Sequence, residues 1–179
     1  MKEEDLKNIF LQENSEGVFT HNDLINNQNT LRGYILFMTV QIERKIDNYL
    51  STHFCASSKK KNQINELIFF TERITLDMKR QVFVSLLKAN ESPFLKENPD
   101  FLKVLENIVP HRNIFAHLET YSLRELSWDD RKKLVFKKYS NGELRPKRYE
   151  QKDISDLQTD LMYIDFSLDL ILQELPPLI

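Results

Sequence analysis

The chain has 179 residues, of which 41% are apolar and 29% are charged, a composition typical of a folded globular domain and not of a disordered chain. Its formal net charge of −2 gives no general attraction to nucleic acid, so RNA or DNA binding would need a local basic patch. Three glycines and one cysteine, Cys55, argue against a β-rich fold, against glycine-rich phosphate loops and against an intrachain disulfide.

These totals favour one domain that spans residues 1–179. The charged first segment, "MKEEDLKNIF", lacks the apolar core of a signal peptide, and no apolar run reaches the length of a membrane span. We therefore expect a cytoplasmic protein that makes no membrane contact. Residues 1–30 are expected to form an N-terminal extension to the helical domain.

The first predicted helix covers residues 31–54. Its apolar residues recur every three or four positions, which is the helical period: Leu31, Ile35, Met38, Ile42, Ile46, Tyr49 and Leu50. The first half carries a second apolar row, formed by Tyr34, Phe37 and Val40. A helix that is apolar on two sides needs two covers, so we expect either another helix or another subunit over the second row.

Two further helices are predicted after a basic loop at residues 59–61. The first is short, and its apolar residues are Ile64, Leu67, Ile68 and Phe70. The second covers residues 75–90, where the apolar row at helical spacing is Met78, Val82, Leu86 and Ala89. We expect both rows to be buried.

The fourth predicted helix begins at "NPDF", with Asn98 as the N-cap and Pro99 in the first helical position. It runs into the polar stretch "VPHRNIFAHLET", residues 109–120, where Pro110 is expected to kink or restart it. The last helix covers residues 153–175. Its apolar residues are spaced almost as heptads, which predicts one buried stripe: Ile154, Leu157, Leu161, Ile164, Leu168, Ile171 and Leu175.

One segment, residues 133–149, is predicted to be a β-hairpin. Asn141 and Gly142 separate two short alternating runs, which is the strongest short-range hairpin signal, and Pro146 marks an edge strand. An isolated hairpin is only marginally stable, so this one should pack on the helices. The expected fold is therefore all-α: a single antiparallel helical bundle with one small β-hairpin inserted before the last helix.

Several kinds of active site lack their residues in this sequence. There is no Gly-x-Gly-x-x-Gly or Walker loop to hold a nucleotide, and no Gly-x-Ser-x-Gly nucleophile elbow. The soft metal ligands form two pairs, His53 with Cys55 and His111 with His117, and neither is backed by a second pair at ligand spacing. We therefore expect neither a metal site nor a cofactor.

The basic run from residue 131 to residue 148 holds eight lysines and arginines around the predicted hairpin. These charges can form a solvated edge that prevents strand-to-strand aggregation, or a patch that binds phosphate. The solvated edge is the simpler interpretation, both here and for residues 59–61. Tyr121 and Trp128 are expected to be packing residues, and Glu43 is expected to be a surface charge.

The strongest candidate site is "RNIFAH", residues 112–117. On a helix, Asn113 and His117 are four residues apart and lie on one face, and the long Arg112 side chain can reach the same patch. A guanidinium binds phosphate through two hydrogen bonds, and an imidazole transfers protons near neutral pH. The same residues could instead form a buried hydrogen-bonded cluster that fixes helix packing, so both interpretations stay open.

In an all-α chain, "RNIFAH" resembles the R-x(4–6)-H signature of the HEPN superfamily, which often reads R-N-x-x-x-H. The expected order of helices is also similar, with a long early helix, the motif helix and a long last helix. The resemblance implies a metal-independent endoribonuclease, often a toxin or an antiviral-defence effector, in which two copies of the motif face each other across a homodimer. It makes Arg112 and His117 the signature pair and Asn113 the polar residue that follows the arginine.

The resemblance also implies the chemistry and the partners. One histidine would deprotonate the RNA 2′-hydroxyl, a second would protonate the leaving 5′-oxygen, and arginines would stabilise the phosphate charge. An antitoxin or a defence protein is an expected partner. Some HEPN toxins are silenced through a tyrosine two residues after the motif histidine, whereas this chain has Glu119 there and its nearest tyrosine at Tyr121. Many HEPN domains are catalytically silent, so the alternative is a non-catalytic helical dimerisation or regulatory protein, HEPN-like or similar to mannitol-repressor bundles.

Overall fold

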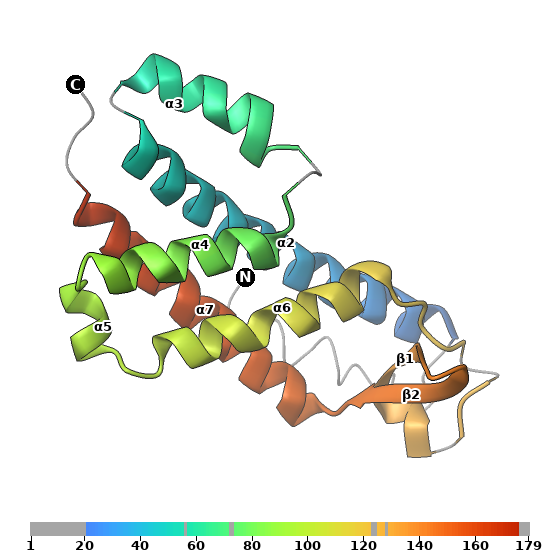
Figure 1. Cartoon of the computed structure of the whole chain (residues 1–179). Helices are drawn as coiled ribbons and strands as arrows, with labels where there is room; N and C mark the ends of the chain where they lie inside the picture. The colour runs from blue at the N-terminus through green and yellow to red at the C-terminus, as the bar shows by residue number, and fades with distance from the viewer. Residues whose placement is uncertain (1–20, 56, 72–73, 123–124, 128, 176–179) are drawn as a thin grey trace. The chain divides into compact units, whose positions relative to one another are not determined.

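The computed structural model describes residues 21–55, 57–71, 74–122, 125–127 and 129–175. The protein is mostly helical, with 71% of its residues in helices, and a small two-stranded antiparallel hairpin precedes the last helix (Figure 1). The predicted secondary-structure class and the place of the hairpin are therefore confirmed. The described part of the chain contains six α-helices.

The chain divides into two compact units, and each is described by itself. The motif unit contains residues 1–37 and 112–158, and the helical unit contains residues 38–111 and 159–179. Three long helices contribute residues to both units: α2 (His21–Phe54), α6 (Phe101–His117) and α7 (Gln151–Gln173).

The helical unit is built around a core of large apolar side chains. Besides its parts of the three long helices, it contains α3 (Ser58–Ile64), the π-helical turn η1 (Asn65–Phe69), α4 (Leu76–Ala89) and the short α5 (Pro93–Glu97). Its buried apolar residues include Ile42, Ile46, Leu50, Phe83, Leu87, Phe101, Leu105, Leu161, Ile164 and Leu168. Burying one such side chain contributes about 1.5–3 kcal/mol, so this core is a main source of the unit's stability.

The two longest predicted helices are confirmed, with shifted ends. In α2 the first apolar row is buried apart from the half-buried Met38, and in α7 the heptad-like stripe is buried from Ile154 to Ile171. The helix α2 starts at His21, ten residues before its predicted start, so the described residues 21–30 belong to this helix. Pro176 and Pro177, expected to stop the last helix, lie outside the described residues.

The second apolar row of α2 has no full cover within the described chain. Phe37 and Val40 are exposed, and Tyr34 is half-buried. A predicted cover by another helix of the same chain is thus not found there. Large exposed apolar side chains that lie in a row are typical of surfaces that contact another molecule.

The segment from α3 to η1 corrects two predictions. Residues 59–61 lie inside α3 and not in a loop, and Lys61 donates a hydrogen bond from its ammonium to the Asn48 amide oxygen. Leu67, Ile68 and Phe70 were expected to be buried, but all three are exposed, Leu67 to 70%, and Phe69 is buried instead. The Phe70 N–H donates to the Asn65 carbonyl at 2.8 Å, a five-residue hydrogen bond. Such a bond widens the turn by one residue, which changes the residue that faces inward.

The helix α4 buries a different row from the predicted one. Met78 and Val82 are exposed, and the buried residues are Leu76, Lys79, Phe83 and Leu87. Both rows have the helical period, and the predicted apolar row did not include Lys79. Burial of a lysine is favourable only when its charge is paired, and this pairing comes from other elements. The sequence pattern alone therefore favoured the wrong face.

The start of α6 also differs from the prediction. Asn98 is the C-cap of α5, where its side-chain amide donates to the Phe94 carbonyl at 3.1 Å, and α6 begins at Phe101. Asn98 is not the N-cap of α6, because its side chain satisfies the end of the preceding helix. The helix α6 does not restart at Pro110; it continues through this residue to His117.

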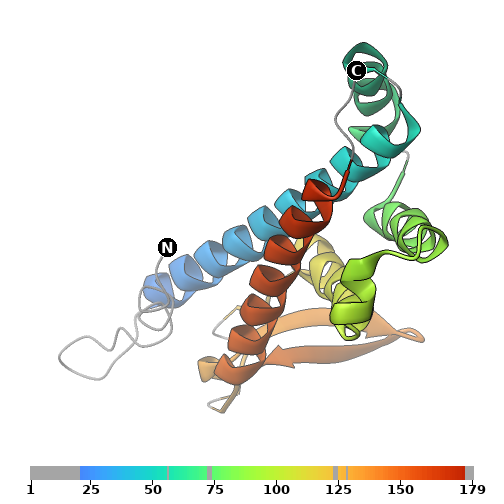
Figure 2. The same ribbon diagram turned by 90° about the vertical axis from the view of Figure 1, so that its left-hand side faces the viewer.

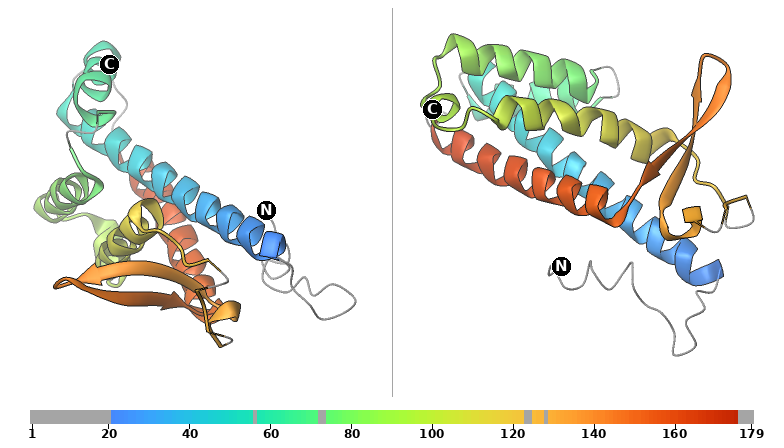
Figure 3. Two further views of the ribbon diagram at one scale, coloured as in Figure 1. Left: turned by 90° about the vertical axis from the view of Figure 1, so that its right-hand side faces the viewer. Right: turned by 90° about the horizontal axis from the view of Figure 1, so that it is seen from below.

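The motif unit contains the predicted hairpin. Strand β1 (Leu134–Ser140) pairs antiparallel with β2 (Glu143–Tyr149), and Figures 2 and 3 show the two strands side by side up to their turn. Asn141 and Gly142 occupy the turn with positive φ angles of 52° and 79°, as a type I′ turn requires. The short 3-10 helix η2 (Asp129–Lys132) precedes β1. The position and the register of the hairpin thus follow from the Asn-Gly pair.

Candidate functional site: the end of helix α6

The buried ring of Phe115 fixes the orientation of the last turns of α6. Phe115 is fully buried, and its ring meets the rings of Phe136 on β1 and Tyr149 on β2 at centroid distances of 5.0 and 5.2 Å. The expected packing of the hairpin on a helix is thereby confirmed. Residues two positions from Phe115 point about 160° away from it. Asn113 and His117 must therefore lie on the opposite, solvent-facing side of the helix.

The chain after α6 is held against the hairpin. The Lys137 N–H donates to the Glu119 carbonyl at 2.7 Å, and the Tyr121 N–H donates to the Val135 carbonyl at 3.0 Å. Between these bonds Thr120 forms an isolated antiparallel bridge with Phe136. Backbone bonds on one side and the Phe115 ring contacts on the other therefore set the position of the helix end.

Arg112, Asn113 and His117 lie together at this helix end. Nη1 of Arg112 donates to Oδ1 of Asn113 at 3.3 Å and lies 3.2 Å from Nε2 of His117. Asn113 and His117 are exposed, and Arg112 is half-buried. The guanidinium therefore lies between the amide and the imidazole on the surface of the motif unit. The interpretation of these residues as a buried packing cluster is wrong, because two of the three face solvent.

The contact between Nη1 of Arg112 and Nε2 of His117 is a hydrogen bond in only one tautomer of the neutral imidazole. A guanidinium is a donor only, so a hydrogen bond to Nε2 requires a lone pair on that atom. The neutral ring then carries its hydrogen on Nδ1. In this arrangement the basic nitrogen of His117 is occupied by Arg112, and any group that draws the guanidinium away sets Nε2 free to accept a proton.

A second arginine, not found by sequence reasoning, borders the motif. Nη2 of Arg32 on α2 donates to the carbonyl of Ala116 at 3.0 Å. The last carbonyls of a helix lack partners within the helix and carry partial negative charge, so a cation there stabilises the helix end. Arg32 is 84 residues from Ala116 in sequence, and no periodicity or spacing signal could have joined them.

Three residues of the basic run, Lys133, Lys137 and Arg148, pair with carboxylates from outside the strands. Lys133 pairs with Glu150 at 3.2 Å, Lys137 with Glu119 and Glu125 at 3.0 Å each, and Arg148 with Asp130 at 2.8 Å. The Ser122 N–H, at 2.9 Å from the Glu125 carboxylate, and the Lys137 ammonium lower the pKa of Glu125 to about 2. These basic side chains therefore hold the hairpin to its flanking segments. Arg131 and Lys132, also in the run, belong to η2.

The remaining candidates from the sequence have structural environments. The ring of His53 stacks on Tyr49 with centroids 6.2 Å apart, and Cys55 is buried. The ring of Tyr121 lies below the Lys137 ammonium at 5.4 Å, in agreement with its expected packing role. Trp128 lies outside the described residues. Within the described ranges no group of three His, Cys, Asp or Glu side chains could hold a metal ion.

Glu43 is part of a buried ion cluster in the helical unit, which corrects its interpretation as a surface charge. Nζ of Lys79, 2% exposed, lies 2.7 Å from Oε1 of Glu43 and 3.0 Å from Oδ2 of Asp47. It also donates to the Phe69 carbonyl at 2.7 Å. Burial raises the pKa of Asp47 to about 6, although the Lys79 ammonium acts in the opposite direction. The cluster joins α2, η1 and α4, and its enclosed position indicates a structural role.

No helix among the described residues is both long and apolar enough to cross a membrane. Comparisons of the chain with protein-family models, with curated proteins and with solved structures find no significant match.

Proposed function

We propose that the protein is a metal-independent endoribonuclease of the HEPN type, which acts as a homodimer with RNA as its substrate. One observation carries the proposal: Nη1 of Arg112 lies within hydrogen-bond distance of both Asn113 and His117 on an exposed helix end. These are the residues at which the sequence resembles the superfamily signature. An effector of this type would be a toxin or an antiviral-defence protein, controlled by an antitoxin or another defence partner.

The proposed reaction starts with RNA at the exposed helix end. The phosphate draws the Arg112 guanidinium into two charge-assisted hydrogen bonds, and Nε2 of His117 is then free. This nitrogen takes the proton of the 2′-hydroxyl, whose oxygen attacks the adjacent phosphorus. The bond from phosphorus to the 5′-oxygen breaks, and the 5′-oxygen takes a proton from a second imidazole. The products are a 2′,3′-cyclic phosphate and a free 5′-hydroxyl.

A second copy of the chain supplies that second imidazole. One motif offers a single histidine, and the same nitrogen cannot act as base and acid in one step. In a two-fold dimer, each copy contributes the same residues to a shared site. The exposed apolar residues of α2, Phe37 and Val40, support an assembly of this kind, since burial against a second copy would remove them from water.

A second candidate function is a non-catalytic helical dimerisation or regulatory protein. Exposed apolar side chains on α7, namely Met162, Phe166 and Leu170, favour it, because an interaction surface needs no reactive group. In this case Arg112 and His117 would stabilise the helix end only. The two candidates differ in what happens to RNA when His117 is changed.

The test is the incubation of purified protein with single-stranded RNA and, separately, with single-stranded DNA of the same sequence. We expect cleavage of RNA in excess EDTA, 2′,3′-cyclic phosphate ends and uncut DNA, which lacks the nucleophile. His117→Ala should abolish cleavage, and Arg112→Lys should reduce it strongly, since an ammonium cannot form the planar fork on a phosphate. Because His117 is exposed, its substitution should change the free energy of unfolding by less than about 0.5 kcal/mol.

Two results would contradict the proposal. Cleavage by His117→Ala at the wild-type rate would mean that another site cuts the RNA. Uncut RNA with both the wild type and the variant would favour the non-catalytic function.

A further inference from the structure

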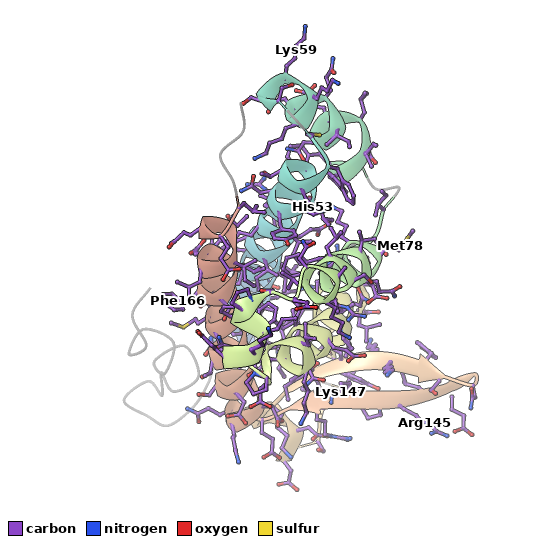
Figure 4. All side chains as sticks on the ribbon, turned by 60° about the vertical axis from the view of Figure 1, so that its left-hand side comes forward. His53, Lys59, Met78, Arg145, Lys147 and Phe166 are labelled. Atoms are coloured by element: carbon purple, nitrogen blue, oxygen red, sulfur yellow. The ribbon has the colours of Figure 1, made fainter. Side chains whose placement is uncertain are left out.

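Three cations lie on one face of the β1–β2 hairpin. In the register of the two strands, Lys138 is directly opposite Arg145, and Lys147 is two residues from Arg145 on the same strand. Alternate residues of a strand, and residues directly opposite each other, share a face of the sheet. All three side chains are exposed. Figure 4 shows Arg145 nearer the turn of the hairpin and Lys147 nearer its base.

The same face of the hairpin reaches the motif helix. Phe136 is opposite Lys147 in the register and two residues from Lys138, so it shares their face. At the base of the hairpin this face contacts Phe115 of α6 through Phe136 and Tyr149. The Lys147 ammonium lies 5.1 Å above the ring of Tyr149. The cationic face of the hairpin therefore adjoins the aromatic cluster of Phe115, Phe136 and Tyr149, which positions the helix end that carries the candidate site.

The charges on this face are not explained by the stability of the hairpin. Among the described residues Lys138 and Lys147 pair with no acidic side chain, and Arg145 pairs only with the exposed Glu143, at 3.0 Å. Like charges directly opposite each other, as with Lys138 and Arg145, destabilise a strand pair. Lys133, Lys137 and Arg148 are different, because each has a carboxylate partner. A cluster of cations that repel one another is expected where an anionic ligand binds.

We propose that Lys138, Arg145 and Lys147 form an RNA-binding arm, which holds the phosphate backbone of the substrate and directs it to Arg112, Asn113 and His117. The inference rests on the proposed function and states how the RNA strand is positioned at that site. Side chains two residues apart on a strand are about 6.6 Å apart, comparable to the length of one nucleotide in an extended strand. Arg145 and Lys147 can therefore contact successive phosphates, and Lys138, opposite Arg145 on the other strand, adds a third contact.

The contacts are to phosphate, so the arm binds RNA and single-stranded DNA alike. Selection of RNA is left to the 2′-hydroxyl at the motif. Binding should weaken as salt is added, because each phosphate contact releases bound counterions; for a single strand the slope of log K against log salt is about −0.7 for each contact. Three contacts then account for a slope of about −2.

The experiment measures binding of a fluorescein-labelled single-stranded RNA by anisotropy in the His117→Ala background, in which the probe stays intact. The arm variant carries Lys138→Ala, Arg145→Ala and Lys147→Ala. The matched control carries Lys59→Ala, Lys60→Ala and Lys103→Ala, three exposed lysines of the helical unit. Both sets remove three positive charges from a chain of formal net charge −2, which gives −5 in each case.

We expect the arm variant to bind up to about a hundredfold more weakly at about 0.1 M salt and to lose about 2 from its salt slope, while the control keeps the slope of its parent. A further variant, Lys138→Glu, places opposite charges across the strand pair. It should stabilise the hairpin and still weaken RNA binding, which separates binding from folding.

Unchanged RNA affinity and salt slope in the arm variant would contradict the proposed RNA-binding arm. An equal loss of RNA affinity in the control variant would contradict it as well. Failure of the proposed function has a different signature, namely RNA that stays uncut by the wild type, and this does not affect the binding measurement. If the wild type cuts RNA and the arm variant cuts it with the same KM, the proposed endoribonuclease activity is supported and the proposed RNA-binding arm is contradicted.

Discussion

At the scale of single residues, the sequence predicts most of the geometry of the candidate site. The spacing of Asn113 and His117 places them on one helical face, and the structure brings Nη1 of Arg112 between them. The spacing in the sequence does not predict whether these side chains are buried or exposed. Whether the three side chains face solvent is decided by Phe115, whose ring contacts come from β1 and β2.

The buried cluster of Lys79, Glu43 and Asp47 leads to a prediction about pH. The pKa of Asp47 is raised from 3.8 to about 6 in the fold, so the folded protein binds this proton more tightly than the unfolded chain does. Stability from the protonated carboxyl is present below about pH 4 and is lost as the pH rises to about 6. Over this window, the free energy of unfolding of the wild type relative to Asp47→Asn should fall by about 3 kcal/mol. Urea unfolding across this pH range measures it.

Asp77 is a control of opposite sign for this measurement. The hydrogen bond from Arg80 lowers the pKa of Asp77, so its stabilising contribution is lost as the pH falls. The difference between the wild type and Asp77→Asn should therefore change in the opposite direction. Parallel pH curves for the wild type and Asp47→Asn would show that the fold does not raise the pKa of Asp47.

At the scale of elements, the hairpin is held by its base and free at its tip. Phe136 is fully buried against Phe115 and Tyr149, whereas Tyr139, on the same strand, is 68% exposed. Both are aromatic residues of β1, and the alternating pattern of the strand does not tell which of them is anchored. The helix end that carries the candidate site is packed against the anchored one.

This contrast gives a matched pair of substitutions. Phe136→Ala should lower the free energy of unfolding by about 3–5 kcal/mol, because it removes a buried ring and leaves a cavity. Tyr139→Ala should change it by less than about 0.5 kcal/mol. Both values are obtained from urea unfolding followed by circular dichroism. Equal effects of the two substitutions would mean that the base of the hairpin does not anchor it to α6.

At the scale of the whole molecule, exposed apolar rows indicate contacts beyond one chain. Met162, Phe166 and Leu170 follow one another at intervals of four residues on α7 and are exposed, Phe166 to 64% (Figure 4). A further set lies on η1, where Leu67 and Ile68 are exposed. Exposed apolar surface of this kind belongs to an interaction site more often than other protein surface does.

We expect the wild type to be a dimer at micromolar concentration by light scattering. Phe37→Asp should convert it to a monomer, because the substitution places a charge in the exposed apolar row of α2, and a buried unpaired charge is costly. Leu67→Asp, at an exposed apolar position of η1, should leave the dimer intact. A dimer that is lost with Leu67→Asp and kept with Phe37→Asp would place the interface on η1. A wild-type monomer would contradict both the dimer and the shared site.

The sequence by itself determined the features that depend on neighbours along the chain. The helical period set the buried faces of α2 and α7, the Asn141-Gly142 pair set the turn of the hairpin, and the spacing within residues 112–117 brought the candidate site residues together. Each of these is a local relation: backbone geometry converts a spacing in sequence directly into a shared face or a turn.

Only the tertiary structure decided the features that depend on partners far away in sequence. Lys79 is buried because Glu43, Asp47 and the Phe69 carbonyl surround it, which moved the buried face of α4 away from Met78. Arg32 reaches Ala116 across 84 positions. Carboxylates from outside the strands pair with Lys133, Lys137 and Arg148, whereas Lys138, Arg145 and Lys147 lie together on one face of the hairpin. The reason is common to all three: the cost of burying or crowding a charge depends on which opposite charges lie beside it, and only the folded chain brings these together.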